Sequence, residues 1–258
     1  MAKPAQAVIR EEHSAFPLMR VYVWQLPVRV THWIIVFTIA VLSFTGYYMH
    51  NPFIVATGKT QFLMATMRFL HTVTGFALLA AMIVRLYWFF AGNRWAHWRA
   101  FLPLHIKQWK GALEMGKYYL FLRPRPVSTA GHNNLAALSY CAIYGLLALE
   151  ILTGLVLFNH VRHSPLIGFF VGWIPGLIDI QNLRLIHFFS MFLFFFFMIH
   201  HMWAGFYISS HEGKGVMESI FSGFKFMRRE DLEADLNFRA SLIAGDKPEE
   251  EETGGLGV

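Results

Sequence analysis

Histidine is the residue type whose placement in this chain points most clearly to chemistry. The sequence contains 13 histidines, and five of them fall within or at the ends of long apolar stretches. These five are His32, His71, His187, His200 and His201. Ionisable side chains inside such stretches are rare and usually functional, and imidazole is a common ligand for transition metals. The sequence therefore predicts metal ligation within the apolar part of the chain.

The spacing within the last apolar stretch selects His201 over its neighbour His200. His187 and His201 are 14 residues apart, which on an α-helix is a rotation of about 1400°, about 40° short of four full turns. The two rings therefore share one face and are separated by about 21 Å along the helix axis. His200 is turned roughly 140° away from His187. We therefore expect it to pack between helices, or to contact a metal-binding residue without binding the metal itself.

The remaining histidines complete two pairs at two depths of the membrane. His71 lies near the same membrane face as His187, and His32 lies near the opposite face, as His201 does. Two imidazoles that face each other across a helix bundle are typical axial ligands of a b-type haem. Hydrogen bonds between helices or a proton path are the alternative, but two pairs matched in depth favour two haem b groups. The single cysteine of the chain excludes a cysteine-clustered zinc or iron–sulfur site.

Arginines and glycines recur at helical spacing from these histidines. An arginine precedes three of them by three residues, and such arginines can pair with anionic haem propionates at the membrane edge. Glycines on the same faces can leave room for a porphyrin. The candidate cofactor-binding residues are Arg29, Arg68, Arg85, Arg184, Gly46 and Gly75. The alternatives are snorkelling of Arg29 and Arg85 to the cytoplasm and plain helix packing at the glycines.

Four long apolar stretches must position these groups. They cover residues 30–49, 69–91, 135–158 and 185–208. About 20 apolar residues cross a bilayer, and a lipid-facing span must be helical to satisfy its backbone. The 258-residue chain is 55% hydrophobic and only 15% charged, whereas soluble domains carry about 25% charged residues. The predicted fold class is therefore all-α, an integral membrane bundle of four transmembrane helices. Glu150, in the third span, stays open between a proton path, quinone chemistry and a structural pairing.

Lysine and arginine gather on one side of the membrane. They crowd the N-terminal arm (residues 1–29), the loop between the second and third spans, and the tail (residues 211–258). The positive-inside rule therefore places both termini in the cytoplasm. In this orientation His71 and His187 hold the outer haem, and His32 and His201 hold the inner haem. The net charge of +6 follows from this topology, which leaves little reason to expect nucleic-acid binding.

The polar segments are expected to flank a four-helix dihaem membrane domain over residues 30–210. In the cytoplasmic loop, apolar residues share one helical face, which predicts a cytoplasmic amphipathic helix on the lipid of the inner leaflet. These residues are Leu102, Ile106, Trp109, Leu113 and Leu120. The tail ends in GDKPEEEETGGLGV, whose composition predicts disorder. The polar N-terminus predicts no cleavable signal peptide.

Five strings in a fixed order resemble the cytochrome b subunit of membrane-bound NiFe-hydrogenases. They are VYVWQLPVRVTHW, LSFTGYY, RFLHTVTGF, RLIHFFSMFLFFFFMIHHMW and SIFSGFKF. Together they cover roughly residues 20–228 and include every predicted span. The resemblance implies a dihaem cytochrome b561-like bundle whose ligands match His32, His71, His187 and His201.

The resemblance also implies partners and an electron acceptor. It implies a periplasmic hydrogenase, with a large nickel–iron subunit and a small iron–sulfur subunit, anchored to the bacterial cytoplasmic (inner) membrane. Electrons would pass through the two haems to a membrane quinone. This chain would hold no hydrogen-activating site, because one cysteine cannot bind nickel and iron. It would therefore be the electron-transfer subunit of a hydrogen:quinone oxidoreductase complex.

Three other functions fit part of the same pattern. A cytochrome b subunit of formate dehydrogenase would carry the same haems with a different soluble partner. A stand-alone cytochrome b561-type superoxide:quinone oxidoreductase would need no partner. A histidine-lined membrane transporter would use the rings without haem, and the absence of a b-type absorption spectrum would favour it.

Overall fold

The structure is a computed structural model that describes residues 18–54, 57–124, 129–212 and 215–244. The predicted disorder at the end of the tail, over residues 245–258, lies outside the described residues. The elements in chain order are β1 (Met19–Tyr22), α1 (Leu26–His50), η1 (Gly58–Thr60), α2 (Leu63–Ala91), η2 (Trp98–Ala100), α3 (Ile106–Tyr119), α4 (Asn134–Arg162), α5 (Pro165–Val171), η3 (Ile174–Gly176), α6 (Ile180–Glu212), α7 (Ser219–Ser222), β2 (Phe224–Met227) and α8 (Arg229–Ala244).

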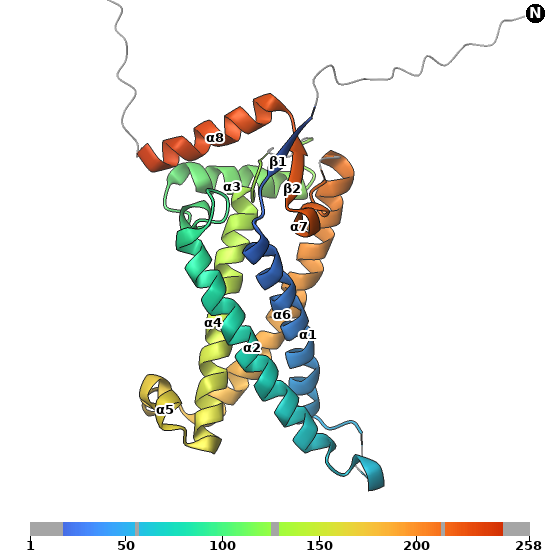
Figure 1. Ribbon diagram of the computed structural model, residues 1–258, viewed down its shortest axis with the longest axis vertical. Coiled ribbons are helices and arrows are strands. Elements are labelled where there is room, and N and C mark those ends of the chain that lie inside the picture. The colour runs from blue at the N-terminus through green and yellow to red at the C-terminus, as the bar shows by residue number, and fades with distance from the viewer. Residues whose placement is uncertain (1–17, 55–56, 125–128, 213–214, 245–258) are drawn as a thin grey trace, which may run out of the picture.

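Four long helices, α1, α2, α4 and α6, run along the length of the molecule (Figure 1). Each is long and apolar enough to cross a membrane, which confirms the predicted four-helix membrane fold. The helices extend a few residues beyond the predicted spans, because a helix continues into polar interfacial sequence until its ends are capped. The start of α1 carries Pro27 in its first turn, and Asn133 caps α4 by accepting a hydrogen bond from the backbone N–H of Ala136 at 2.8 Å.

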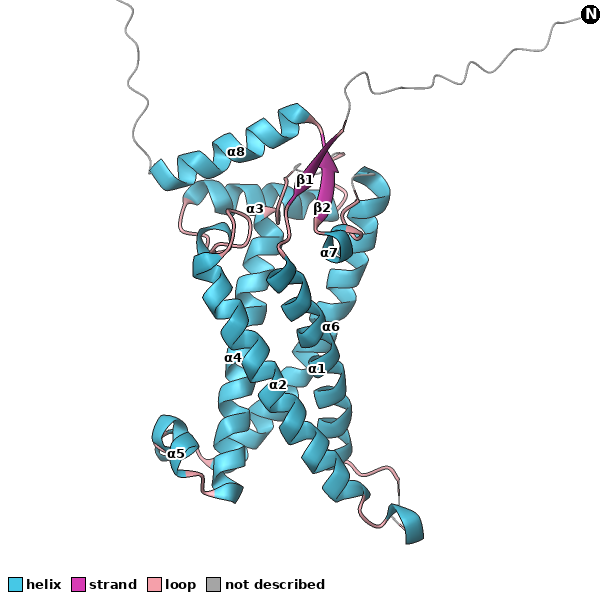
Figure 2. Ribbon diagram, in the orientation of Figure 1, coloured by secondary structure: helices cyan, strands magenta, loops and turns pink. Residues whose placement is uncertain are grey.

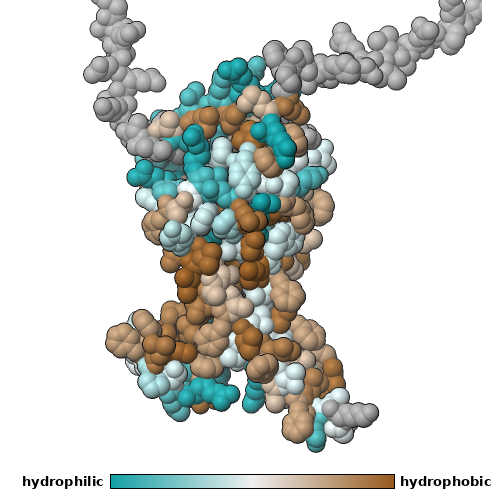
Figure 3. Space-filling view, in the orientation of Figure 1, coloured by the Kyte–Doolittle hydropathy of each residue, from teal (hydrophilic) through white to brown (hydrophobic). Residues whose placement is uncertain are grey.

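The surface of the bundle matches a lipid environment. Apolar side chains form the waist of the molecule, and hydrophilic ones gather at its two ends (Figure 3). Large apolar side chains such as Phe37, Ile83 and Phe196 are 69%, 60% and 75% exposed. A water-soluble protein rarely exposes so large an apolar surface. The outer faces of the spans therefore face lipid, while the functional groups must lie inside.

An apolar cluster occupies the middle of the bundle. Leu78 of α2, Leu147 of α4 and Phe194 of α6 are buried in it, and Ile35 and Ile39 of α1 pack against them. Phe194 is seven residues from both His187 and His201, about 10.5 Å along the axis from each. This cluster therefore separates the two levels at which the histidines lie.

One end of the bundle is covered by α3, α7, α8 and a two-stranded antiparallel sheet (Figure 2). Strand β1 pairs with β2 in a register that sets Met19 opposite Met227 and Tyr22 opposite Phe224. The all-α prediction did not anticipate this small sheet. It pairs the described end of the N-terminal arm with the described part of the tail, so these two segments belong to one folded cap.

Helix α3 falls where the amphipathic helix was predicted. Its buried residues are Gln108, Ala112, Met115 and Tyr118, and the helix packs on α4. The predicted apolar stripe points away from this contact, with Ile106, Trp109 and Leu113 exposed. Its attachment to the inner leaflet stays a prediction.

Asp235 fixes α8 to the cap, and its loss is expected to release this helix. The carboxylate accepts hydrogen bonds from Trp95 Nε1 at 3.1 Å and from Arg239 Nε at 2.9 Å, and the side chains of Asp235 and Arg239 are only 1% and 12% exposed. Asp235→Ala leaves the arginine buried and unpaired, which costs about 3–5 kcal/mol. Hydrogen exchange in detergent should show faster opening of α8. Glu233→Ala is the control, because its ion pair with Arg229 is exposed and contributes about 0.2–1 kcal/mol. Equal protection of α8 in both variants would contradict this role.

Candidate functional site

His71 of α2 and His187 of α6 face each other, with ring centroids 6.2 Å apart and an interplanar angle of 72°. A threonine lies against the Nδ1 atom of each ring, Thr45 Oγ1 at 2.9 Å from His71 and Thr153 Oγ1 at 2.8 Å from His187. Both hydroxyls also lie within 2.8 Å of a helix carbonyl four residues earlier. Each hydroxyl therefore donates to its own helix and accepts the imidazole Nδ1–H, which leaves the Nε2 lone pair of each ring for a metal ion.

A glycine follows each of these threonines and makes room for the ring. A Cβ atom on Gly46 would lie 3.3 Å from Cε1 of His71, and a Cβ atom on Gly154 would lie 3.3 Å from Cε1 of His187. Both distances are tighter than ordinary van der Waals contact. The Thr–Gly pairs of α1 and α4 thus hold the two rings in the same way.

A cavity of about 300 Å³ opens beside this pair and is lined by all four long helices. Its lining includes both rings together with Gly46, Gly75 and Gly154. A Cβ atom on Gly75 would meet nothing within 4 Å, so this predicted glycine borders open space. Gly46, by contrast, has the ring of His71 as its nearest neighbour.

His32 of α1 and His201 of α6 form the second pair, with ring centroids 6.4 Å apart. The ring of His201 stacks on Phe197 at 5.4 Å and lies within 3.3 Å of the Tyr140 hydroxyl through Nδ1. His200 instead lies beside Tyr119 and Trp203. The structure thus brings His201, and not His200, to His32, as the helix geometry predicted.

Both pairs have a separation that would allow their two rings to bind one metal ion between them. Because a metal–imidazole bond is about 2 Å long and the nitrogen lies about 1.1 Å from the ring centre, an ion between two opposed rings holds the centroids about 6 Å apart. The observed centroid distances are 6.2 Å and 6.4 Å. Two imidazoles at this spacing fit a bis-histidine haem, and the pair of His71 and His187 also lies beside the cavity. The roles of individual residues stay predictions.

Arg85 supplies a buried positive charge toward the cap end of α2. Its side chain is 3% exposed and donates a hydrogen bond from Nε to the Tyr144 hydroxyl at 2.8 Å. The guanidinium also lies 4.9 Å from the ring centre of Phe89. Within the described part of the chain its Nη1 atom is buried with no hydrogen-bond partner. Since a buried donor of this kind needs an acceptor, Arg85 fits an anionic group such as a propionate.

The other predicted arginines are placed differently. Arg29 donates a hydrogen bond from Nη1 to the backbone carbonyl of Phe221 and so ties α1 to α7. Arg68 is exposed at the start of α2. Arg184 is exposed on α6, where its Nη1 donates to Gln181 Oε1 at 3.3 Å. These contacts leave the guanidinium groups of Arg68 and Arg184 at the molecular surface.

His132 lies between the cap and the pair of His32 and His201. Its ring centroid lies 4.3 Å from that of Tyr140 and 4.5 Å from that of Trp24. Burial lowers the pKa of His132 well below its ordinary value, and the nearby Arg85 charge adds to this effect. The ring is therefore neutral at physiological pH and packs as an aromatic group over the tyrosine that contacts His201.

Several groups that contact the paired rings were not predicted from the sequence. Thr45, Thr153, Gly154 and Tyr140 were not singled out, and Glu150 was left without a partner. The structure places Glu150 Oε2 2.6 Å from His187 Nδ1. The signal that could have found the first three is the recurrence of Thr–Gly in two spans, at positions 45–46 and 153–154.

Comparison with known proteins gives a consistent set of matches. The family described as prokaryotic cytochrome b561 matches residues 23–223. The "Probable Ni/Fe-hydrogenase B-type cytochrome subunit" of Rhizobium leguminosarum bv. viciae is 31% identical over 226 residues, which cover 84% of this chain and 94% of that protein. The protein of the same name from Rhodobacter capsulatus is 29% identical over 83% of this chain and 84% of its own length. The "Probable Ni/Fe-hydrogenase 1 B-type cytochrome subunit" of Escherichia coli (strain K12) is 28% identical over 79% and 90%.

Proposed function

The chain belongs to the prokaryotic cytochrome b561 family, and we propose that it is the dihaem cytochrome b subunit of a membrane-bound NiFe-hydrogenase. It would anchor the hydrogenase and carry electrons from it across the membrane to quinone. The names of the relatives support the hydrogenase partner. The single observation that carries the electron route is the presence of two opposed imidazole pairs in one bundle, with centroids 6.2 Å and 6.4 Å apart.

The chain's own residues would hold the two groups and keep them apart. His71 and His187 would ligate the outer haem, and His32 and His201 the inner haem. When bound, the two haem irons would supply one-electron carriers at two depths of the membrane. The apolar cluster around Phe194 keeps water out of the space between the two levels.

Charge placement supports the proposed orientation. Most lysines and arginines lie in the arm, the loop between α2 and α4, and the tail, so the cap faces the cytoplasm of a bacterial inner membrane with both termini on that side. The outer pair then lies toward the periplasm, where the small iron–sulfur and large nickel–iron subunits would deliver electrons. The inner pair, beside Arg85 and Tyr140, would lie nearer the site of quinone reduction.

Purification of the complex tests this function. We expect the chain to co-purify with the hydrogenase subunits, to show a b-type spectrum with two haems per chain, and to be reduced by hydrogen. Deleting the chain should lower hydrogen-driven quinone reduction in membranes at least tenfold, while hydrogen oxidation with a soluble dye persists. Absence of b-type haem, or reduction by formate in place of hydrogen, would reject the proposal.

A further inference from the structure

We propose that Glu150 is a positioning residue that lowers the midpoint potential of the outer haem by acting as an anionic hydrogen-bond acceptor for His187. This inference rests on the proposed function, because it takes His71 and His187 as ligands of one haem. Nothing in the ligand geometry itself demands a carboxylate at this place. Its presence inside a membrane span therefore needs an account of its own.

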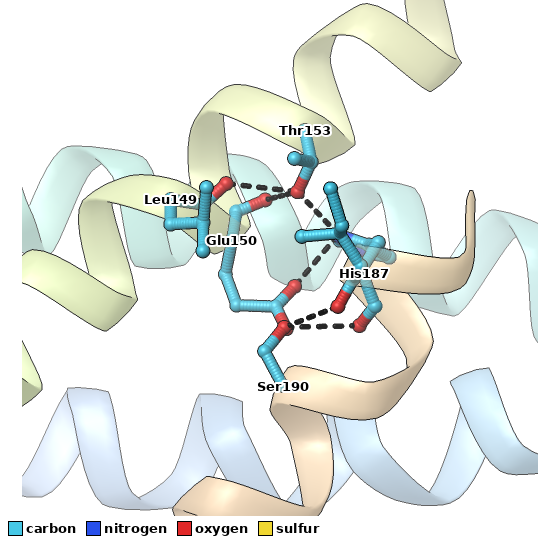
Figure 4. A network of polar contacts seen from close by, with 6 residues as sticks. Leu149, Glu150, Thr153, His187 and Ser190 are labelled. Atoms are coloured by element: carbon cyan, nitrogen blue, oxygen red, sulfur yellow. Dashed lines mark hydrogen bonds and ion pairs between the residues drawn. The ribbon is translucent and has the colours of Figure 1, made fainter. Parts of the chain in front are cut away.

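The contact between Glu150 and His187 is direct. Glu150 Oε2 lies 2.6 Å from His187 Nδ1, and the two side chains are only 14% and 23% exposed. Ser190, one helical turn after His187, donates to the other carboxylate oxygen, Oε1. Figure 4 shows the carboxylate of α4 reaching across to His187 and Ser190 of α6, with Thr153 above the same ring nitrogen.

Both oxygens of the carboxylate thus face a group that can donate a proton. An ionised carboxylate only accepts hydrogen bonds, and here His187 lies against Oε2 and Ser190 against Oε1. The Nδ1–H of His187 is shared between Glu150 and Thr153. The imidazole therefore ligates through Nε2 with a negative charge in contact with its far side.

The partner ring, His71, shows that a carboxylate is not needed to hold a histidine here. Its Nδ1 atom lies 2.9 Å from Thr45 Oγ1, just as His187 Nδ1 lies 2.8 Å from Thr153 Oγ1. Glu150 is three residues before Thr153, and the residue three before Thr45 is Leu42. The site around His187 therefore has a carboxylate where the site around His71 has an apolar side chain. The two rings are held alike, and they differ in the charge next to the ring.

The direction of the effect follows from charge. A buried anion beside a metal ligand makes the ligand a stronger electron donor and stabilises the oxidised iron, which carries one more positive charge than the reduced iron. Screening is weak inside the bundle, so the attraction reaches the metal through the ring. Removing the charge should therefore make the outer haem easier to reduce.

Glu150→Gln tests the proposal, since glutamine keeps the shape and an accepting oxygen but loses the charge. In redox titrations of the purified full chain, the wave that disappears in His187→Ala is the outer haem. We expect this wave to shift upward in Glu150→Gln by at least about 59 mV, a tenfold change in the ratio of reduced to oxidised haem. The inner wave should stay in place, and both haems should be retained. Thr153→Val, which removes only the neutral acceptor, should change the ratio less than about threefold.

The outcomes separate this inference from the function on which it rests. An outer wave that does not move in Glu150→Gln would overturn it, as would equal shifts in Glu150→Gln and Thr153→Val. If the glutamine variant loses the outer haem, Glu150→Leu decides by the same criterion, because it also removes the charge and places at this site the residue type that Leu42 has three residues before Thr45. A raised potential supports the proposal, and an unchanged one overturns it. A wild-type chain without b-type haem would instead reject the proposed function.

Discussion

Replacing His201 with alanine is expected to halve the haem content of the chain, from two haems to one, whereas His200→Ala keeps both. The ring of His201 faces His32 at 6.4 Å and contacts Tyr140, while His200 is turned to Tyr119 and Trp203. Under the proposed assignment, loss of this imidazole would leave the inner haem with a single protein ligand. The ratio of haem to protein, measured by a haemochrome assay on the purified chain, checks the expectation.

The adjacent histidines make this a closely matched pair of variants. Both substitutions remove one imidazole from the same turn of α6, so a general weakening of that helix would affect them equally. The remaining haem in His201→Ala should be the one held by His71 and His187. Two haems in His201→Ala, or a lost haem in His200→Ala, would contradict the assignment of the inner ligands.

The geometry of one helix, together with depth in the membrane, was enough to predict which histidines meet. The four spans are continuous apolar runs, and a helix repeats its faces at a fixed angle, so His187 and His201 had to share a side. Depth then left His71 and His32 as their partners, because α1 and α2 cross the membrane in opposite directions. The structure brings the same pairs together.

The supporting groups were harder to predict because they depend on how two helices meet. Thr45 and Thr153 read as ordinary polar residues of a span, since a threonine can always bond its own helix backbone. Their second role appears only when α2 and α6 bring a ring to each of them. The β1–β2 sheet escaped prediction for a similar reason: its strands are four residues each and more than 200 residues apart in the sequence.

The predicted arginines show the limit of spacing as an argument. All four lie at helical spacing from a histidine, yet their surroundings differ. Among the described residues, Arg85 is buried and its Nη1 atom has no hydrogen-bond partner, whereas Arg29 bonds the carbonyl of Phe221 through Nη1 and leaves its buried Nε atom without a partner. Helical spacing determines on which face of the helix a residue lies. It does not determine toward which end of the helix a long side chain extends. Within the described part of the chain, Arg85 and Arg29 are therefore the two of these arginines that keep a buried donor for an anion.

Because Gly46 makes room for the ring of His71, a larger side chain at this position is expected to weaken binding of the outer haem. A Cβ atom there would lie 3.3 Å from Cε1 of His71, and the branched atoms of valine, which has one preferred rotamer in a helix, would press further on the ring. To relieve the contact His71 must tilt, which would break its bond to Thr45 and turn Nε2 away from the haem that it is proposed to bind. Loss of such supporting contacts typically lowers metal affinity about 10–100-fold. Gly46→Val should therefore lower the haem content from two toward one.

Gly145→Val is the matched control, because it makes the same substitution in a span. A Cβ atom on Gly145 would meet nothing within 4 Å, and the residue is exposed on α4. Both variants place a β-branched residue inside a transmembrane helix, so any cost of helix propensity is shared. We expect Gly145→Val to keep two haems and Gly46→Val to lose the outer wave in redox titration while the inner wave stays. Equal haem content in the two variants would mean that His71 does not depend on the space beside Gly46. It would contradict the inference that the glycine of each Thr–Gly pair makes room for a ligand ring.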